Sequence, residues 1–353
     1  MSILFAILLF SFLIFIHEFG HFIAAKLSNV QVNEFSLFMG PAIWKKQRGE
    51  TLYALRCIPI GGYCAMEGED EDTDNPRSFQ KADWWKRLVI LVAGAACNFV
   101  VGVLIMVIVF LPSQRFITPT IESFETWSTI QGEDGLQVGD TFLEVDGEKI
   151  YTQSNVSLML SLNPGDVHDV VVDRNGQRVE LEDFVMEKHE ITNADGTKSL
   201  LYGFTFGIED ATLGTKLQNA WYSCLDTVRT VRLSLQMLLT GRAGLKDMSG
   251  PVGIVQIMSD TAAASETTFD AFINMLYFGG FIAINLAVMN LLPIPALDGG
   301  RVVGLLLTVV VEKITKKKID PKYEGYLHGA GMMLLLILMA VIMFKDIFVI
   351  FKG

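Results

Sequence analysis

The sequence predicts a polytopic α-helical membrane protein with four transmembrane helices, an inserted extracytoplasmic α+β domain and a membrane-associated β-hairpin. Three observations support this prediction. The chain of 353 residues is 51% hydrophobic and has a mean hydropathy of +0.39, which is too apolar for an ordinary soluble domain. Four apolar stretches are long enough to cross a bilayer of about 30 Å. A long acidic and polar stretch separates the second apolar stretch from the third.

The predicted parts follow one another along the chain. In order, we expect a first span at 1–25, a cytoplasmic loop with a re-entrant hairpin at 26–87, a second span at 88–111, a soluble domain at 116–208, an interfacial amphipathic helix and a turn at 213–253, a third span within 270–300, a basic cytoplasmic loop at 301–327 and a fourth span at 328–350.

The first span contains the pattern H-E-x-x-H at His17, Glu18 and His21. On a helix, histidines four residues apart project from one face, where two neutral imidazoles can hold a zinc ion. Glu18 is then placed to act as the general base on a metal-activated water. Helix-interior polar groups bonded to neighbouring helices are the plainer interpretation. Because polar groups are costly in hydrocarbon, three of them within five residues favour a functional site.

The loop after this span has the pattern of a hairpin. Residues 32–37 and 51–56 alternate like strands, a basic turn lies between them, and Ile58-Pro59-Ile60-Gly61-Gly62-Tyr63 follows. A simple cytosolic loop is one interpretation. The other is a hairpin that dips beside the first helix and offers a strand edge to an extended peptide.

The second span begins with an aromatic and basic cluster at 84–87, which is typical of a cytoplasmic helix end. Gly94 and its neighbouring alanines favour close helix packing, and Asn98 is the strongly polar side chain of the span. We expect Asn98 to form an interhelical hydrogen bond, with the metal site as the alternative place for it.

The third span ends in the run Asn290-Leu291-Leu292-Pro293-Ile294-Pro295-Ala296-Leu297-Asp298-Gly299-Gly300. A catalytic zinc with two histidines needs a third protein ligand, and Asp298 is the best candidate. If the first helix runs inward, the third span also runs inward and leaves Asp298 at the depth of His17 and His21. This holds only if 213–241 does not cross the membrane, which its mid-segment charges support. Lys and Arg crowd 26–87 and 301–325, as the positive-inside rule requires.

The acidic domain reads as alternating strands and turns, with Gly135-Leu136-Gln137-Val138-Gly139-Asp140 before a strand that ends in Val145-Asp146-Gly147. This segment resembles a PDZ domain, and a second hairpin turns at Asn175-Gly176. The net charge of -11 argues against nucleic acid as a partner. The four cysteines are scattered, so neither a disulfide framework nor a second zinc site is expected.

With these residues placed, the chain resembles the site-2 protease family of intramembrane zinc metalloproteases, peptidase family M50, and within it the bacterial members that contain PDZ domains. The resemblance implies one Zn²⁺ per chain, held by His17, His21 and Asp298, with Glu18 activating water. It also implies that Asn285 and Asn290 engage the substrate backbone. The hairpin with Gly61, Gly62 and Tyr63 would clamp an extended substrate.

The resemblance further implies a function and a place in the cell. The substrates would be single-span membrane proteins, such as a trimmed anti-sigma factor or a remnant signal peptide, and the outer domain would bind a peptide or protein and exclude untrimmed proteins. The protein would lie in the lipid of the bacterial cytoplasmic membrane, with its active site near the cytoplasmic face. An inactive PDZ-bearing membrane receptor and a metal transporter are the two rival functions.

Overall fold

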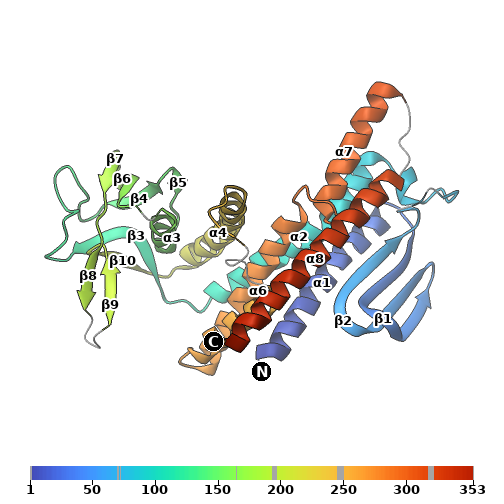
Figure 1. Cartoon of the computed structure of the whole chain (residues 1–353), viewed down its shortest axis with the longest axis horizontal. Helices are drawn as coiled ribbons and strands as arrows, with labels where there is room; N and C mark the ends of the chain where they lie inside the picture. Colours follow the sequence, from blue (N-terminus) through green and yellow to red (C-terminus); the bar gives the residue numbers. More distant parts are fainter. Residues whose placement is uncertain are drawn as a thin grey trace. The chain divides into compact units, whose positions relative to one another are not determined.

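The computed structural model describes residues 2–69, 71, 73–163, 165–192, 197–244, 250–316 and 322–352. The chain forms two compact units. One unit combines residues 1–109 with 227–353, and the other consists of residues 110–226. Figure 1 shows the helices and strands of both units.

Four helices in the described part of the chain are long and apolar enough to cross a membrane, as the sequence predicts. They are α1 (Ser2–Leu27), α2 (Trp84–Phe110), α6 (Thr268–Asn290) and α8 (Lys322–Lys352). In the first unit, α1, α2 and α6 run side by side (Figure 1), and the contacts of glycines on these helices agree with this arrangement. The predicted number of spans is therefore matched by four helices of suitable length and composition.

Helices α1 and α2 touch at a pair of glycines. A Cβ atom on Gly20 would lie 2.4 Å from the carbonyl oxygen of Ala93 and 2.9 Å from the Cα of Gly94. No side chain fits into this crossing, so the two backbones meet directly, as small-residue faces allow in membranes. Farther along α2, Gly102 gives the same close approach to Ile284 of α6. The glycines therefore set how near the three helices come to each other.

The predicted hairpin is present and is longer than expected. Strand β1 covers Val32–Arg48 and strand β2 covers Thr51–Met66. Residues 34–37 have partners on two sides, pairing with 62–65 and also with 52–55. The hairpin is thus a small folded sheet, in which β1 bends near Gly40 at a φ of +86°.

Ion pairs hold this sheet in shape and attach it to α1. The Arg56 guanidinium donates to the carboxylate of Glu34, to the Ser36 hydroxyl and to the Gly40 carbonyl at the bend. At the hairpin turn, Glu50 accepts from Lys26 of α1 and from Arg77. Hydrogen bonds from Arg77, and next from Lys26, lower the pKa of Glu50 to about 2, so this carboxylate stays charged at neutral pH.

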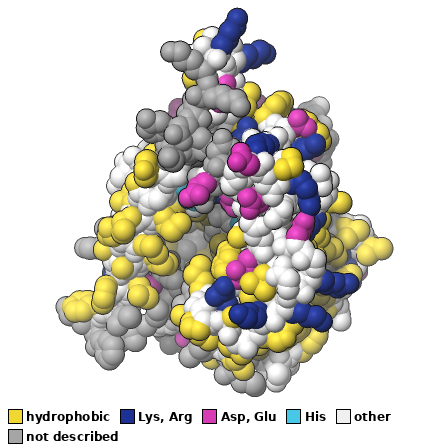
Figure 2. All heavy atoms as spheres, turned by 90° about the vertical axis from the view of Figure 1, so that its right-hand side faces the viewer, with side chains coloured by type: hydrophobic (Ala, Val, Ile, Leu, Met, Phe, Trp, Pro, Cys, Tyr) yellow, Lys and Arg dark blue, Asp and Glu magenta, His cyan; other side chains and the backbone are white. Residues whose placement is uncertain are grey.

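The outer face of the hairpin carries apolar and basic side chains together. Ile43 and Trp44 are 68% and 52% exposed, and the neighbouring Lys45, Lys46 and Arg48 are exposed as well. Figure 2 shows this face, with hydrophobic side chains among Lys and Arg. Aromatic and basic residues in this combination are typical of a membrane surface, which supports the predicted membrane association of the hairpin.

The second unit is an α+β domain built on one antiparallel sheet. Its strand order is β10-β3-β4-β6-β7, and β5 pairs with the C-terminal end of β4. The strands are β3 (Arg115–Phe124), β4 (Thr141–Val145), β5 (Glu148–Lys149), β6 (Val167–Arg174), β7 (Gln177–Val185) and β10 (Phe204–Asp210), with the helix α3 (Gln153–Leu162) and a separate ribbon of β8 (His189–Thr192) and β9 (Lys198–Leu201). The expected turn at Asn175-Gly176 is present, and both residues have positive φ.

Two segments differ from the prediction. Residues 298–315 form helix α7 (Asp298–Thr315), where a basic loop over 301–327 was expected, because the apolar residues before the lysine cluster have helical periodicity. Pro251 begins helix α5 (Pro251–Ala263) where a turn was expected, because proline suits the first turn of a helix. Ser249 of that turn and Lys317 and Lys318 of that loop lie outside the described residues. The predicted amphipathic helix is α4 (Leu213–Leu239).

The glycine crossing gives a stability prediction. Gly20→Ala should lower the thermal unfolding temperature of the purified protein in detergent, because forcing a methyl group into this contact costs about 1–3 kcal/mol. Gly329→Ala is the matched control, since a Cβ there meets no atom within 4 Å and alanine favours a helix over glycine. Equal melting temperatures for the two variants would contradict the role given to the crossing.

Candidate metal centre

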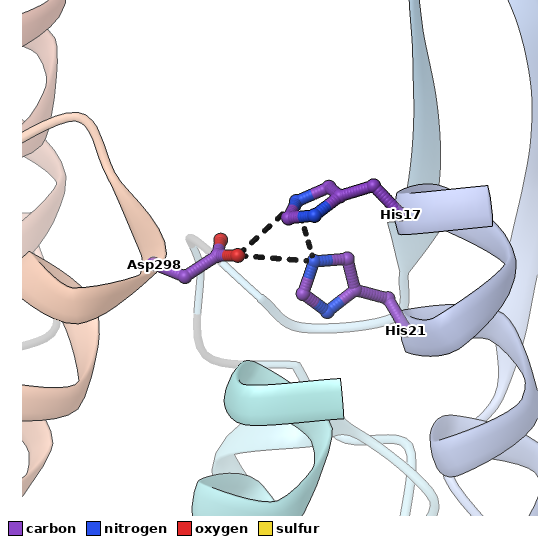
Figure 3. A group of neighbouring side chains, drawn as sticks. All are labelled: His17, His21 and Asp298. Atoms are coloured by element: carbon purple, nitrogen blue, oxygen red, sulfur yellow. Dashed lines mark hydrogen bonds and ion pairs between the residues drawn. The ribbon is translucent and has the colours of Figure 1, made fainter. Parts of the chain in front are cut away.

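Three side chains converge at the C-terminal half of α1. His17 and His21 stand one turn apart on α1, and Asp298 is the first residue of α7 (Figure 3). Oδ2 of Asp298 lies 3.2 Å from Nε2 of His17 and 3.3 Å from Nε2 of His21. The two Nε2 atoms are 3.2 Å apart. The structure thus brings together the three residues that the sequence predicts as metal ligands.

The size of this triangle suits zinc. Donors bound tetrahedrally at 2.0–2.1 Å from zinc lie about 3.3 Å from one another. All three measured separations fall within about 0.1 Å of that value. Two imidazole nitrogens and one carboxylate oxygen are also a usual donor set for catalytic zinc, which leaves the fourth position open. These residues could therefore hold a zinc ion.

Hydrogen bonding at His21 adds a second indication. Its Nδ1 lies 2.8 Å from the carbonyl oxygen of Ile90 on α2, and a carbonyl can only accept, so Nδ1 carries the proton. In the neutral ring, Nε2 then turns a lone pair toward Oδ2 of Asp298. This oxygen is buried and accepts no hydrogen bond of normal geometry from the described residues. Two lone pairs that face each other in this way are stabilised by a cation between them.

Tight local packing presents Asp298 to the histidines. The connection from α6 contains Pro293 and Pro295, and α7 starts directly after it. A Cβ on Gly299 would lie 2.3 Å from the carbonyl of Leu291, and one on Gly300 would lie 2.3 Å from the Ile294 oxygen. The first turn of α7 therefore needs both glycines to fold back onto the connection that precedes it.

Glu18 faces the hairpin. A Cβ on Gly62 would lie 3.4 Å from Cγ of Glu18, and the backbone of the neighbouring Cys64 also approaches the Glu18 carboxylate. Gly61 stands at the bend just before, with a φ of +76°. The Tyr63 ring points elsewhere and lies under the Arg56 guanidinium, 5.5 Å from ring centroid to Cζ. Burial raises the pKa of the Cys64 thiol, so this cysteine stays neutral beside the site.

The two predicted asparagines of α6 take different positions. Nδ2 of Asn290 lies 3.4 Å from Nδ1 of His17, which places Asn290 directly behind this histidine. Asn285 is half-buried on the same helix. Five residues turn an α-helix by about 140°, so Asn285 and Asn290 point to different sides. Asn290 is thus the asparagine that contacts the triad.

Helix α2 contributes a residue that the sequence analysis assigned to helix packing alone. A Cβ on Gly94 would lie 2.4 Å from Nε2 of His21 and 2.8 Å from Cε1 of His17. The space for the histidine rings therefore depends on this glycine. One turn farther, Asn98 is 1% exposed, and its Oδ1 has no hydrogen-bond partner among the described residues, so the expected interhelical bond of this oxygen is not formed.

Comparison with known proteins agrees with this site. The profile of peptidase family M50 matches residues 5–338. A relative from Clostridium acetobutylicum, assigned by name to the zinc metalloproteases, is 36% identical across 98% of this chain and 97% of its own. One from Clostridium perfringens is 34% identical across 98% of both chains. The zinc metalloprotease RasP of Oceanobacillus iheyensis is 28% identical across 97% of each. The chain, with four apolar helices and a triangle of donor atoms whose size suits zinc, belongs to peptidase family M50 and is a membrane zinc metallopeptidase of the site-2 protease type.

Proposed function

We propose that this protein cleaves peptide bonds of single-span membrane proteins at the depth of its own helices. His17, His21 and Asp298 hold one zinc ion, and Glu18 is the general base. The single observation that carries the proposal is the triangle of three donor atoms at 3.2–3.3 Å, formed between an apolar helix and the start of α7. Buried polar groups of this kind are costly in a membrane unless they have a function.

The chemistry divides between the metal and the chain. Zinc supplies a Lewis acid and lowers the pKa of water, so that water can attack at neutral pH. Glu18 takes the proton of the attacking water and passes it to the leaving amine. Gly62 leaves room for the Glu18 side chain beside β2. Ile90 fixes the ring of His21 through Nδ1. The Asn290 carboxamide lies 3.4 Å from Nδ1 of His17, and a flip of this amide would let its oxygen accept from Nδ1–H and fix that ring in the same way.

The substrate must reach Glu18 as an extended chain, because the hydrogen bonds of a helix shield its carbonyl groups. Residues 62–66 of β2 support this step. They pair with β1 on one side only among the described residues, and Gly62 lies against Glu18. An extended peptide can add to this edge and satisfy backbone groups that lipid cannot. Gly61, Gly62 and Tyr63 then line the substrate together with Asn290. Asn285 contacts the substrate at a more distant position along the substrate chain.

The membrane orientation follows from the order of the helices. An inward α1 places His17 and His21 near the cytoplasmic face, α2 returns outward, and α6 runs inward to deliver Asp298 to the same depth. The bacterial RasP relatives support the cytoplasmic membrane as the location. The acidic unit then lies outside the cytoplasm, where its sheet and helix act as a PDZ-like domain. It binds a peptide and excludes untrimmed proteins, so the substrates are trimmed proteins, such as an anti-sigma factor or a remnant signal peptide.

The two rival functions explain less of the site. A receptor without proteolytic activity does not need three metal donors and a carboxylate beside them. A metal transporter needs polar groups spread along a path through the membrane. Within the described residues, the possible metal ligands form one cluster, His17, His21 and Asp298. The protease therefore accounts best for Glu18 and for the strand edge next to it.

The role of Glu18 can be tested with Glu18→Gln. Cleavage of a single-span substrate in detergent should fall by about 100-fold or more, because general base catalysis contributes factors of that size, while the zinc content should stay at about one per chain. Glu71→Gln, at an exposed carboxylate, is the control and should cut like the parent. A Glu18→Gln variant that cuts normally would refute the assignment.

The third ligand can be tested by metal analysis. Asp298→Asn should reduce the zinc retained after dialysis against a chelator well below one per chain, because the amide oxygen is neutral and a weaker donor than a carboxylate. Asp260→Asn makes the same change at an exposed position of α5 and should keep its zinc. If both variants hold as much zinc as the parent does, Asp298 is not a ligand.

A further inference from the structure

The N-terminal part of α8 packs directly on the connection that presents Asp298. Nδ1 of His328 accepts a hydrogen bond of 3.1 Å from the backbone N–H of Ala296. One turn along, a Cβ on Gly331 would lie 2.5 Å from Cβ of Pro295 and 2.6 Å from its oxygen. Helix α8 and the connection between α6 and α7 are therefore in contact at both positions. A side chain at residue 331 would push them apart.

Ala296 has a backbone conformation that needs such support. Its φ is +86°, a region that residues other than glycine seldom adopt. Only Leu297 stands between this residue and Asp298. A change of the Ala296 backbone angle would redirect the start of α7 and move the Asp298 carboxylate away from the histidines. The hydrogen bond from its N–H to His328 holds this angle in place.

The contact is notable because α8 is otherwise peripheral. No residue is buried in the most hydrophobic stretch of its apolar segment, 325–346. At its other end, Asp346 accepts hydrogen bonds from the backbone of Gly250 and Gly253 at the start of α5. The described part of α8 is therefore held near its two ends, and the end with His328 touches the segment that carries a metal donor.

From this geometry we infer that His328 is a positioning residue for zinc binding. It acts through Ala296 and keeps Asp298 in the place required for the metal. His328 is the first residue of the predicted fourth span, and the structure gives its side chain a specific partner. The inference rests on the proposed function, in which Asp298 is a zinc ligand. As an acceptor, Nδ1 carries no proton, so the neutral ring carries its proton on Nε2.

A matched pair of substitutions tests this role in the full-length protein in detergent. In His328→Asn, the side-chain oxygen can take the place of Nδ1, whereas His328→Gln carries its amide one bond farther out, near the place of Nε2. Zinc affinity, measured by competition with a chelator, should fall by about 10–100-fold in the Gln variant, as for other residues that support metal ligands. The Asn variant should stay within about threefold of the parent, well below that range. The visible spectrum of bound Co²⁺ should change only in the Gln variant.

Three further tests separate positioning from simple loss of structure. Adding Ala296→Gly to His328→Gln should recover most of the lost affinity, because glycine adopts a positive φ without the support of His328. The melting temperatures of the metal-free Asn and Gln variants should agree. His189→Gln, in the other unit, should leave zinc affinity unchanged. Equal affinities for the Asn and Gln variants would overturn the inference, whereas a parent protein without zinc would overturn the proposed function itself.

Discussion

The structure depends on one arrangement, in which two imidazole nitrogens and a carboxylate oxygen meet with their lone pairs turned toward one another. Among apolar helices this is unfavourable without a cation, because buried polar groups that face one another without a donor between them are costly. Oδ2 of Asp298 shows the conflict directly, since it is buried and accepts no hydrogen bond of normal geometry from the described residues. A zinc ion removes the conflict, and for this reason we expect the metal to stabilise the helical unit as well as to serve catalysis.

Glycines provide the space for that arrangement, and they reduce the stability of the helices that contain them. Gly20 and Gly94 let α1 and α2 touch, so that Ile90 reaches His21 and the rings fit beside α2. Glycine weakens a helix by about 1 kcal/mol relative to alanine. The apolar packing of α1 and α2 with the hairpin, around residues such as Ala25 and Phe35, offsets this loss. The same packing brings β2 next to Glu18.

The sequence predicted those parts of the site that depend on local spacing. His17 and His21 follow from helical periodicity, and Asp298 follows from the need for a third ligand and from the order of the spans. Contacts between residues that are far apart in the sequence produce no spacing that can be recognised in it. Gly94 was predicted only to pack helices, and the sequence did not predict the contact of His328, because their partners, His21 and Ala296, are far away in the sequence. Helix α7 was missed because the lysines at its end outweighed its apolar face.

One ion pair links the two sides of the site. Arg301 stands one turn after Asp298 on α7, and it binds the carboxylate of Glu69. Glu69 follows β2 and accepts a hydrogen bond from the backbone N–H of Met66, at the end of the strand that passes Glu18. This short chain of contacts connects the hairpin edge to α7. A peptide that adds to this edge, as we propose, would therefore lie next to the general base and one ion pair away from the helix that carries the third metal ligand.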